Sequence, residues 1–457
     1  MRRLIRMLIL CVFLVLTASG CGSVLEKVDL QMTLDPQELY SLPKLPAKYT
    51  ALNDRINEII KGGAEYAAPV TGTNIQPVQL RDLNGDGREE ALAFFRNAAD
   101  EKPLKICIYT VDEDTYEQTA VIEGSGTAIY SISYNDLDGD GKTELVVGWR
   151  VSTELQVLAV YALRASGPVE LLRSDYVKYG IADLNRDERQ EVVVLRSVPD
   201  TGDGVADYYD WEGGSLTART GARISMTMAE LSQQGRLTRG TLRTGEAAYF
   251  VTGVVDSTQA ITDILTLREG DLTNIVLSDA TGVSAETAMF RALYPSDINS
   301  DGITEVPKAE FLPIWEGSDD FYYRIDWNSY DAEGTAESVV RTYHAIEDGW
   351  YFRLPETWAE EIMVSRSIGA DEAAVTFYAR EGRDGTPEPV LRIAAITGAG
   401  RENRAVRGNR FNLIRKAETI YVAELLEANG FWELGITEDE VRSAFSLIPT
   451  EWTEGES

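Results

Sequence analysis

The chain has 457 residues, 44% of them hydrophobic and 26% charged, a composition typical of globular proteins and a length that suggests two or three domains. The formal net charge of −31 argues against nucleic acid as a partner, because so acidic a chain repels phosphate backbones. The single histidine, His344, argues against Ser-His-Asp catalysis and zinc hydrolysis. Frequent Val, Thr and Tyr favour β structure.

Residues 1–20 have the pattern of a secretory signal peptide. Three arginines precede the apolar run Leu8–Leu16, which is too short to span a bilayer, and the small residues Ala18–Gly20 stand directly before Cys21. This ending resembles the lipobox of bacterial lipoproteins. The resemblance implies cleavage before Cys21, a lipid on its thiol and amine, and an extracytoplasmic protein anchored to the bacterial cell membrane.

The segment after the leader predicts a tether, a helix and then a folded body. Residues 21–45 have no clear hydrophobic period, and we expect them to form the lipid anchor and tether. The segment 46–65 is expected to form an amphipathic helix from about Pro46 to Lys61, which Gly62 and Gly63 end. The one thiol left in the body, Cys107, lies in an apolar run and is expected to be buried and free.

Four similar acidic segments recur along the body, starting at positions 82, 136, 183 and 297. Each follows a short apolar run and leads into another: Ala91–Phe95, Leu145–Trp149, Val192–Leu195, and a fourth that Pro307 interrupts. We call them loops 1 to 4: Asp82–Glu90, Asp136–Glu144, Asp183–Glu191 and Asp297–Glu305.

The spacing of oxygen atoms in these loops suits Ca²⁺. Side chains at positions 1, 3 and 5 of a tight turn, the carbonyl of position 7 and the carboxylate of position 9 supply six or seven hard oxygen ligands. The expected ligands are Asp82, Asn84, Asp86, Arg88 and Glu90; Asp136, Asp138, Asp140, Lys142 and Glu144; Asp183, Asn185, Asp187 and Glu191; and Asp297, Asn299, Asp301, Ile303 and Glu305. The calcium would be structural, and the alternative is that the loops are polar turns without an ion.

Two details of the loops qualify this assignment. An EF-hand needs Glu at position 12 and flanking helices, and position 12 here is Ala93, Val147, Val194 or Lys308. In loop 3, Glu188 replaces the glycine that gives position 6 a positive φ, so we expect strain there and leave open whether this loop holds a metal.

The pattern D-x-[DN]-x-D-G-x-x-[DE] between strands resembles the FG-GAP/VCBS repeats of integrin-type β-propellers. The resemblance covers residues 66–345 and implies four-stranded blades with calcium in the loop between the first two strands, although the Phe-Gly and Gly-Ala-Pro signatures are missing. The gap before loop 4 is about twice the others, and Thr241–Val251 fits a degenerate unit between them, without metal. We therefore expect a mainly β fold, a β-propeller of about five blades with a range of five to seven.

Residues 346–457 predict a small α+β C-terminal domain. It should contain strands over Ala373–Ala379 and Val390–Ile396, a helix over Ile414–Ala428, and a last helix that a capping box at Thr437–Glu440 opens.

The sequence shows no catalytic motif, so we expect a binding or scaffold module for a protein or a cell-wall glycan. Two alternatives remain: a carbohydrate-active enzyme that uses carboxylates alone, and an accessory structural lipoprotein. The identity of the ligand, the choice of inner or outer membrane and the oligomeric state do not follow from the sequence.

Overall fold

The computed structural model describes residues 49–112, 115–255, 259–289, 293–316, 320–358 and 360–449. The predicted signal peptide, the lipidation site Cys21 and the tether lie outside the described residues. No helix within the described ranges is long and apolar enough to cross a membrane.

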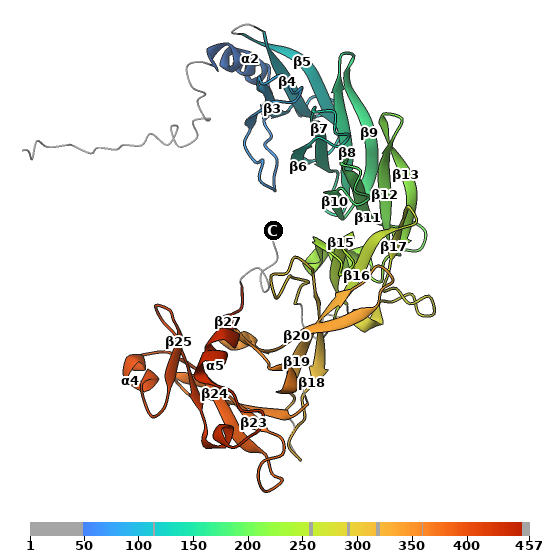
Figure 1. Ribbon diagram of the computed structural model, residues 1–457. Coiled ribbons are helices and arrows are strands. Elements are labelled where there is room, and N and C mark those ends of the chain that lie inside the picture. The colour runs from blue at the N-terminus through green and yellow to red at the C-terminus, as the bar shows by residue number, and fades with distance from the viewer. Residues whose placement is uncertain are drawn as a thin grey trace, which may run out of the picture. The chain divides into compact units, whose positions relative to one another are not determined.

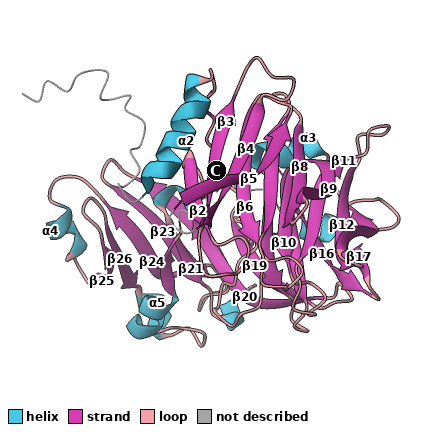
Figure 2. Ribbon diagram, turned by 90° about the horizontal axis from the view of Figure 1, so that it is seen from above, coloured by secondary structure: helices cyan, strands magenta, loops and turns pink. Residues whose placement is uncertain are grey.

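The described residues form six antiparallel sheets, mostly meanders whose consecutive strands lie side by side (Figure 1), and strands dominate the fold (Figure 2). The first sheet has β1 (Glu65–Tyr66) and β2 (Val78–Arg81) on one edge of β3 (Glu90–Arg96), followed by β4 (Leu104–Asp112) and β5 (Thr115–Gly124). The second contains β6 (Ala128–Asn135), β7 (Glu144–Arg150), β8 (Gln156–Arg164) and β9 (Gly167–Tyr176). The third contains β10 (Lys178–Ala182), β11 (Glu191–Ser197), β12 (Gly204–Glu212) and β13 (Ser215–Arg223).

The fourth sheet contains β14 (Arg236–Thr241), β15 (Ala247–Val255), β16 (Gln259–Arg268) and β17 (Asp271–Asn274). The fifth runs from β18 (Val306–Phe311) through β19 (Tyr323–Tyr330), β20 (Ala336–Ala345) and β21 (Trp350–Arg353) to β27 (Phe445–Leu447). The sixth has the order β22 (Ile362–Ile368), β23 (Glu372–Ala379), β24 (Glu388–Ile396), β26 (Ile420–Leu425) and β25 (Phe411–Arg415).

Helices are short and lie between the strands. The α-helices are α2 (Thr50–Lys61), α3 (Met228–Gln234), α4 (Arg401–Ala405) and α5 (Glu438–Ala444), and 3₁₀ turns cover Ala285–Thr287, Ile346–Asp348, Glu356–Trp358 and Glu427–Gly430. Helix α2 falls within the predicted helix, and the capping box on Thr437 and Glu440 opens α5 as predicted.

Burial along the strands follows from the way the sheets share hydrophobic cores. The strand that follows each of loops 1 to 3, β3, β7 or β11, is buried over most of its length, whereas the last strand of a sheet, such as β13, is largely exposed. Phe94 and Trp149 belong to a cluster common to the first two sheets, and Phe250 and Val306 to one common to the fourth and fifth. A strand between two such cores needs apolar residues on both faces, which explains the continuous apolar runs after the acidic loops.

The expected mainly β fold is confirmed. The degenerate unit at Thr241–Val251 also lies where predicted, since it contains the turn from β14 to β15. Pro307 is compatible with β18 because β18 is the edge strand of its sheet. The clusters formed by the described residues connect each sheet to the next in sequence, and a closed propeller is not detected among them.

The predicted helix over Ile414–Ala428 is wrong. Strand β26 occupies its centre and pairs with β24 on one side and β25 on the other. Tyr421 and Val422 are buried, and aromatic and β-branched residues favour a strand that neighbours cover on both sides. The strands predicted at Ala373–Ala379 and Val390–Ile396 are confirmed as β23 and β24. Strands β21 and β27 pair into the fifth sheet, although both lie in the segment 346–457 that was predicted to form a separate C-terminal domain.

Candidate metal-binding loops

Strands flank the acidic loops, as the spacing predicts. Loop 1 connects β2 to β3, loop 2 connects β6 to β7, and loop 3 connects β10 to β11. Loop 4 leads into β18 and is closed by a bridge between Ser296 and Glu305. Each loop therefore joins two antiparallel segments that fix the distance between its ends.

A repeated network of hydrogen bonds shapes all four loops. In loop 1, the carboxylate of Asp82 accepts the backbone N–H groups of Gly85 and Gly87, both at 2.8 Å. The side-chain oxygen of Asn84 accepts the N–H of Asp86, and Asp86 accepts that of Arg88, again at 2.8 Å. The bonds to positions 5, 6 and 7 recur in the other loops at 2.8 to 3.1 Å. The acidic side chains thus face the inside of the turn.

The glutamate at position 9 closes each loop from the following strand. One carboxylate oxygen accepts the N–H of position 2, at 2.8 Å from Leu83 to Glu90 and at 2.7 Å from Leu184 to Glu191. The equivalent bonds to Glu144 and Glu305 measure 2.9 and 3.1 Å. All four glutamates are buried.

The second carboxylate oxygen of this glutamate is the feature that most favours a cation. In Glu191 and Glu305, both 0% exposed, this oxygen is buried and has no hydrogen-bond partner among the described residues. Burial raises the pKa of both groups to about 7, against the lowering effect of the backbone N–H bonds, and neighbouring aspartates raise it further. A buried carboxylate oxygen without a partner is costly, and a bound cation would remove that cost.

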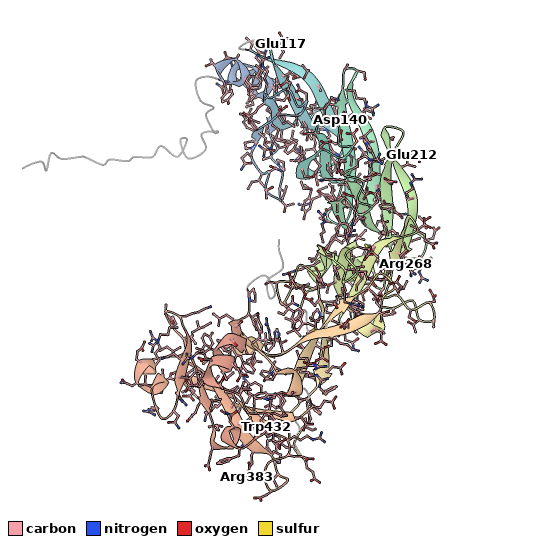
Figure 3. All side chains as sticks on the ribbon, viewed as in Figure 1. Glu117, Asp140, Glu212, Arg268, Arg383 and Trp432 are labelled. Carbon is pink, nitrogen blue, oxygen red and sulfur yellow. The ribbon has the colours of Figure 1, made fainter. Side chains whose placement is uncertain are left out.

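The loops differ in how closely their carboxylates approach. Asp136, Asp138 and Glu144 in loop 2 each offer an oxygen within 4.8 Å of the others. In loop 3, the carboxylates of positions 1, 5 and 9 converge within the same distance. Loops 1 and 4 share the hydrogen-bond frame but form no such group of three among the described residues. Asp140 of loop 2, labelled in Figure 3, is not part of that loop's group of three and pairs with Lys142 instead.

Basic side chains at position 7 pair with the aspartates at position 5, an interaction that was not predicted from the sequence. The ammonium group of Lys142 lies 2.7 Å from a carboxylate oxygen of Asp140, and Arg189 pairs in the same way with Asp187. These hydrogen bonds lower the pKa of both aspartates. The sequence signal was present, since loops 1 to 3 all carry Arg or Lys at this position.

The backbone of loop 3 is strained, as predicted. Glu188 has φ of 70° and Arg186 has φ of 63°, both in the left-handed region that disfavours residues with a Cβ. In loops 1 and 2 the corresponding positions are glycines. Nevertheless loop 3 gathers its carboxylates as closely as loop 2 does.

The loops also contact one another through the main chain, which sequence patterns did not reveal. The N–H of Thr143 in loop 2 donates to the carbonyl of Leu83 in loop 1 at 2.9 Å, and Gln190 in loop 3 donates to Leu137 in loop 2 at 2.9 Å. The N–H of Thr304 in loop 4 donates to Thr241 of the degenerate unit at 3.0 Å. Main-chain bonds therefore join loop 1 to loop 2, loop 2 to loop 3, and the degenerate unit to loop 4.

The fourth sheet, which contains the degenerate unit, carries a buried carboxylate on another strand. Asp263 on β16 is 0% exposed and accepts hydrogen bonds from the backbone and hydroxyl of Ser225, the hydroxyl of Ser284 and the amide of Asn274, at 2.5 to 2.7 Å. Burial raises its pKa, although these donors oppose the shift. Asp263 thereby ties two loops to β16 and β17.

Comparison with known proteins bears on loops 1 and 2. Residues 82–147 match the FG-GAP-like repeat. This match starts at the first aspartate of loop 1 and ends in β7, so it contains both loops and the strands between them. No curated protein matches the chain.

A search of solved structures finds a crystal structure from Bacteroides fragilis, provisionally named 6-phosphogluconolactonase. It is 12% identical in sequence, and the match covers 70% of this chain and 85% of that one with a TM-score of 0.24. A TM-score this low carries no argument about fold or activity.

Proposed function

We propose that loops 1 to 4 bind structural Ca²⁺. The observation that carries this proposal is the buried, unpartnered carboxylate oxygen of Glu191 and of Glu305. The convergence of carboxylates in loops 2 and 3 and the FG-GAP-like match over loops 1 and 2 support it. Oxygen donors at this spacing suit the flexible coordination of Ca²⁺ better than the strict octahedron of Mg²⁺.

We further propose that the sheets carrying these loops form a β-propeller-like module. Four-stranded antiparallel meanders, consecutive cores and the FG-GAP-like repeat support this arrangement. The module would serve as a binding or scaffold unit for a protein or a cell-wall glycan, with no catalytic role. The net charge of −31 disfavours nucleic acid.

The N-terminal pattern supports a lipid anchor on Cys21 and an extracytoplasmic location at the bacterial cell membrane. Metabolic labelling with a radioactive fatty acid tests this: the wild-type protein should incorporate label and Cys21→Ala should not. Equal labelling of both proteins would refute the anchor without affecting the calcium proposal.

Calcium binding is tested by thermal unfolding of the full chain with excess chelator, Mg²⁺ or Ca²⁺. Extracellular calcium modules bind with Kd of about 10⁻⁴ to 10⁻³ M, so about 10 mM Ca²⁺ should stabilise the fold by roughly 1.4 to 2.7 kcal/mol for each occupied site. Mg²⁺ should stabilise it less. An unchanged melting temperature across the three conditions would mean that the loops are polar turns.

A matched pair of variants localises the effect to loop 3. Glu191→Gln removes a predicted ligand, whereas Glu188→Gln makes the same charge change at an exposed position that is not a predicted ligand. Calorimetric titration should show fewer Ca²⁺ sites for Glu191→Gln and the wild-type number for Glu188→Gln. The same number of sites in both variants would exclude loop 3 as a metal site.

A further inference from the structure

The aspartate at position 5 of each loop has two carboxylate oxygens with different partners. One oxygen, Oδ1, accepts the backbone N–H of position 7, at 2.8 Å in Asp86, Asp140 and Asp301 and at 3.0 Å in Asp187. This bond is common to all four loops. The loops therefore differ at position 5 in what holds the second oxygen, Oδ2.

In loops 2 and 3 a cation holds the second oxygen, and it comes from the same residue that donates its N–H to the first. The ammonium group of Lys142 donates to Oδ2 of Asp140 at 2.7 Å. The guanidinium of Arg189 donates to Oδ2 of Asp187 from Nε, at 3.0 Å, and again from Nη2. Its Nη1 also donates to the carbonyl of Trp211 at 3.1 Å. The cation of loop 3 is thus fixed at more points than that of loop 2.

In loops 1 and 4 a neutral amide takes the same place. The side-chain amide of Asn84 donates to Oδ2 of Asp86 at 3.1 Å, and that of Asn299 donates to Oδ2 of Asp301 at 2.8 Å. Position 7 of loop 4 is Ile303, which carries no charge. The four loops therefore share one backbone frame and divide into two pairs by the charge of the group on position 5.

A basic residue at position 7 does not by itself produce the ion pair. Loop 1 carries Arg88 there, but its guanidinium donates to the carbonyl of Val111 at 3.5 Å and forms no ion pair with Asp86 among the described residues. Arg186 in loop 3 likewise donates to a backbone carbonyl, that of Gly245. These two arginines place positive charge on the loops without occupying a carboxylate.

The ion pairs of loops 2 and 3 compete with a bound metal for the same negative charge. A Ca²⁺ ion on either oxygen of Asp140 or Asp187 has to share that carboxylate with a positive group or displace it, whereas in loops 1 and 4 it displaces only a neutral donor. An ion pair near the surface contributes enough to change an affinity by up to about fivefold. Ligand charge is one of the factors that set calcium affinity in oxygen-lined loops.

We propose that Lys142 and Arg189 are built-in competitors of the metal, each holding the position-5 carboxylate of its own loop and lowering the affinity of that loop for Ca²⁺. This inference rests on the proposed calcium function and adds to it a means of setting affinity. Loops 2 and 3 keep their shape around an internal cation and fill at a higher Ca²⁺ concentration than they would without it. Loop 3 is the more strongly affected, because Arg189 is held at more points.

Two double variants with the same change in charge test the proposal. Lys142→Met/Arg189→Met removes both competitors, and Arg88→Met/Arg186→Met removes two basic groups of the loops that bond backbone carbonyls instead. Calorimetric titration of the full chain with Ca²⁺ at about 0.15 M salt limits the effect of distant charges. The competitor variant should bind two ions about three- to fivefold more tightly than wild type, and the control should stay within about twofold.

A second readout follows from unfolding in urea with excess chelator and with about 10 mM Ca²⁺. Tighter binding to the folded state increases the stabilisation that a given concentration of ligand produces. The rise in the unfolding midpoint on adding Ca²⁺ should therefore be larger for the competitor variant than for wild type. The control should show the wild-type rise, whatever its own stability in chelator.

The outcomes separate this inference from the calcium proposal. Equal tightening in both double variants would mean that net charge, and not the ion pair, sets the affinity. Weaker binding in the competitor variant would mean that the ion pairs prepare the loops for the metal, and either result overturns the inference. Wild-type binding in all three proteins overturns it as well and leaves the calcium proposal standing, whereas no binding in any of them overturns both.

Discussion

Alanine substitutions at two glycines of loop 1 distinguish the effect of backbone strain on stability from the effect of contact between loops. Gly85 and Gly87 have φ of 74° and 82°. A Cβ added at Gly85 would lie 2.5 Å from the carbonyl oxygen of Gly141 in loop 2, whereas one at Gly87 would meet nothing within 4 Å. Alanine at either position pays the same conformational cost, and only Gly85→Ala also pushes the two loops apart.

The expected magnitudes differ accordingly. A left-handed alanine costs about 1 to 2 kcal/mol, and its lower entropy in the unfolded chain returns about 0.4 to 1 kcal/mol. Gly87→Ala should therefore lose about 1 kcal/mol of unfolding free energy. Gly85→Ala should lose a further 1 to 3 kcal/mol or so, as overpacking against a rigid carbonyl does.

Urea unfolding with excess chelator measures both variants without any contribution from bound cations. The midpoint for Gly85→Ala should fall clearly below that for Gly87→Ala, with the same slope. Equal midpoints would refute the idea that loops 1 and 2 press against each other. A larger loss for Gly87→Ala would show that strain at position 6, rather than the contact, dominates.

Three further predictions follow from single residues. Glu188→Gly should raise the unfolding free energy by about 0.5 to 1 kcal/mol in urea, because glycine adopts a φ of 70° without strain; a loss would refute this. Asp263→Leu should lower the unfolding free energy by about 3 to 5 kcal/mol, because it leaves several buried donors without an acceptor. An unfolding midpoint like that of wild type would contradict these hydrogen bonds. Burial lowers the pKa of His344 to about 3, so the unfolded chain binds more protons than the folded one between that pH and about 6.5. Stability should thus fall as the pH drops through this window, and His344→Gln should reduce the slope by up to about 1.4 kcal/mol per pH unit; identical slopes would rule this out.

The β character and the loops could be predicted because both depend on local patterns. Alternating Asp, Asn and Gly followed by an apolar run specifies a turn and a strand without reference to the rest of the chain, and loops 1 to 3 join strands as expected. The capping box at Thr437 is local in the same sense. Cys107 is buried because it lies in the apolar strand β4, and it is free, with no second cysteine among the described residues.

What the sequence missed depends on partners far along the chain. Residues 420–425 have a spacing compatible with a helix, and only their pairing with β24 and β25 makes them a strand. Asp263 looks like any polar residue in a strand until Ser225, Asn274 and Ser284 surround it.

The main-chain bonds between neighbouring loops join peptide groups, and this affects how the repeats can diverge. An N–H at position 8 and a carbonyl at position 2 are present whatever side chains stand there, so substitution leaves the bond intact unless proline enters position 8. The degenerate unit lacks the acidic ligands, yet the carbonyl of Thr241, at its first position, accepts the N–H of Thr304. A unit can therefore lose the side chains of an ion site and keep a main-chain bond to the next loop.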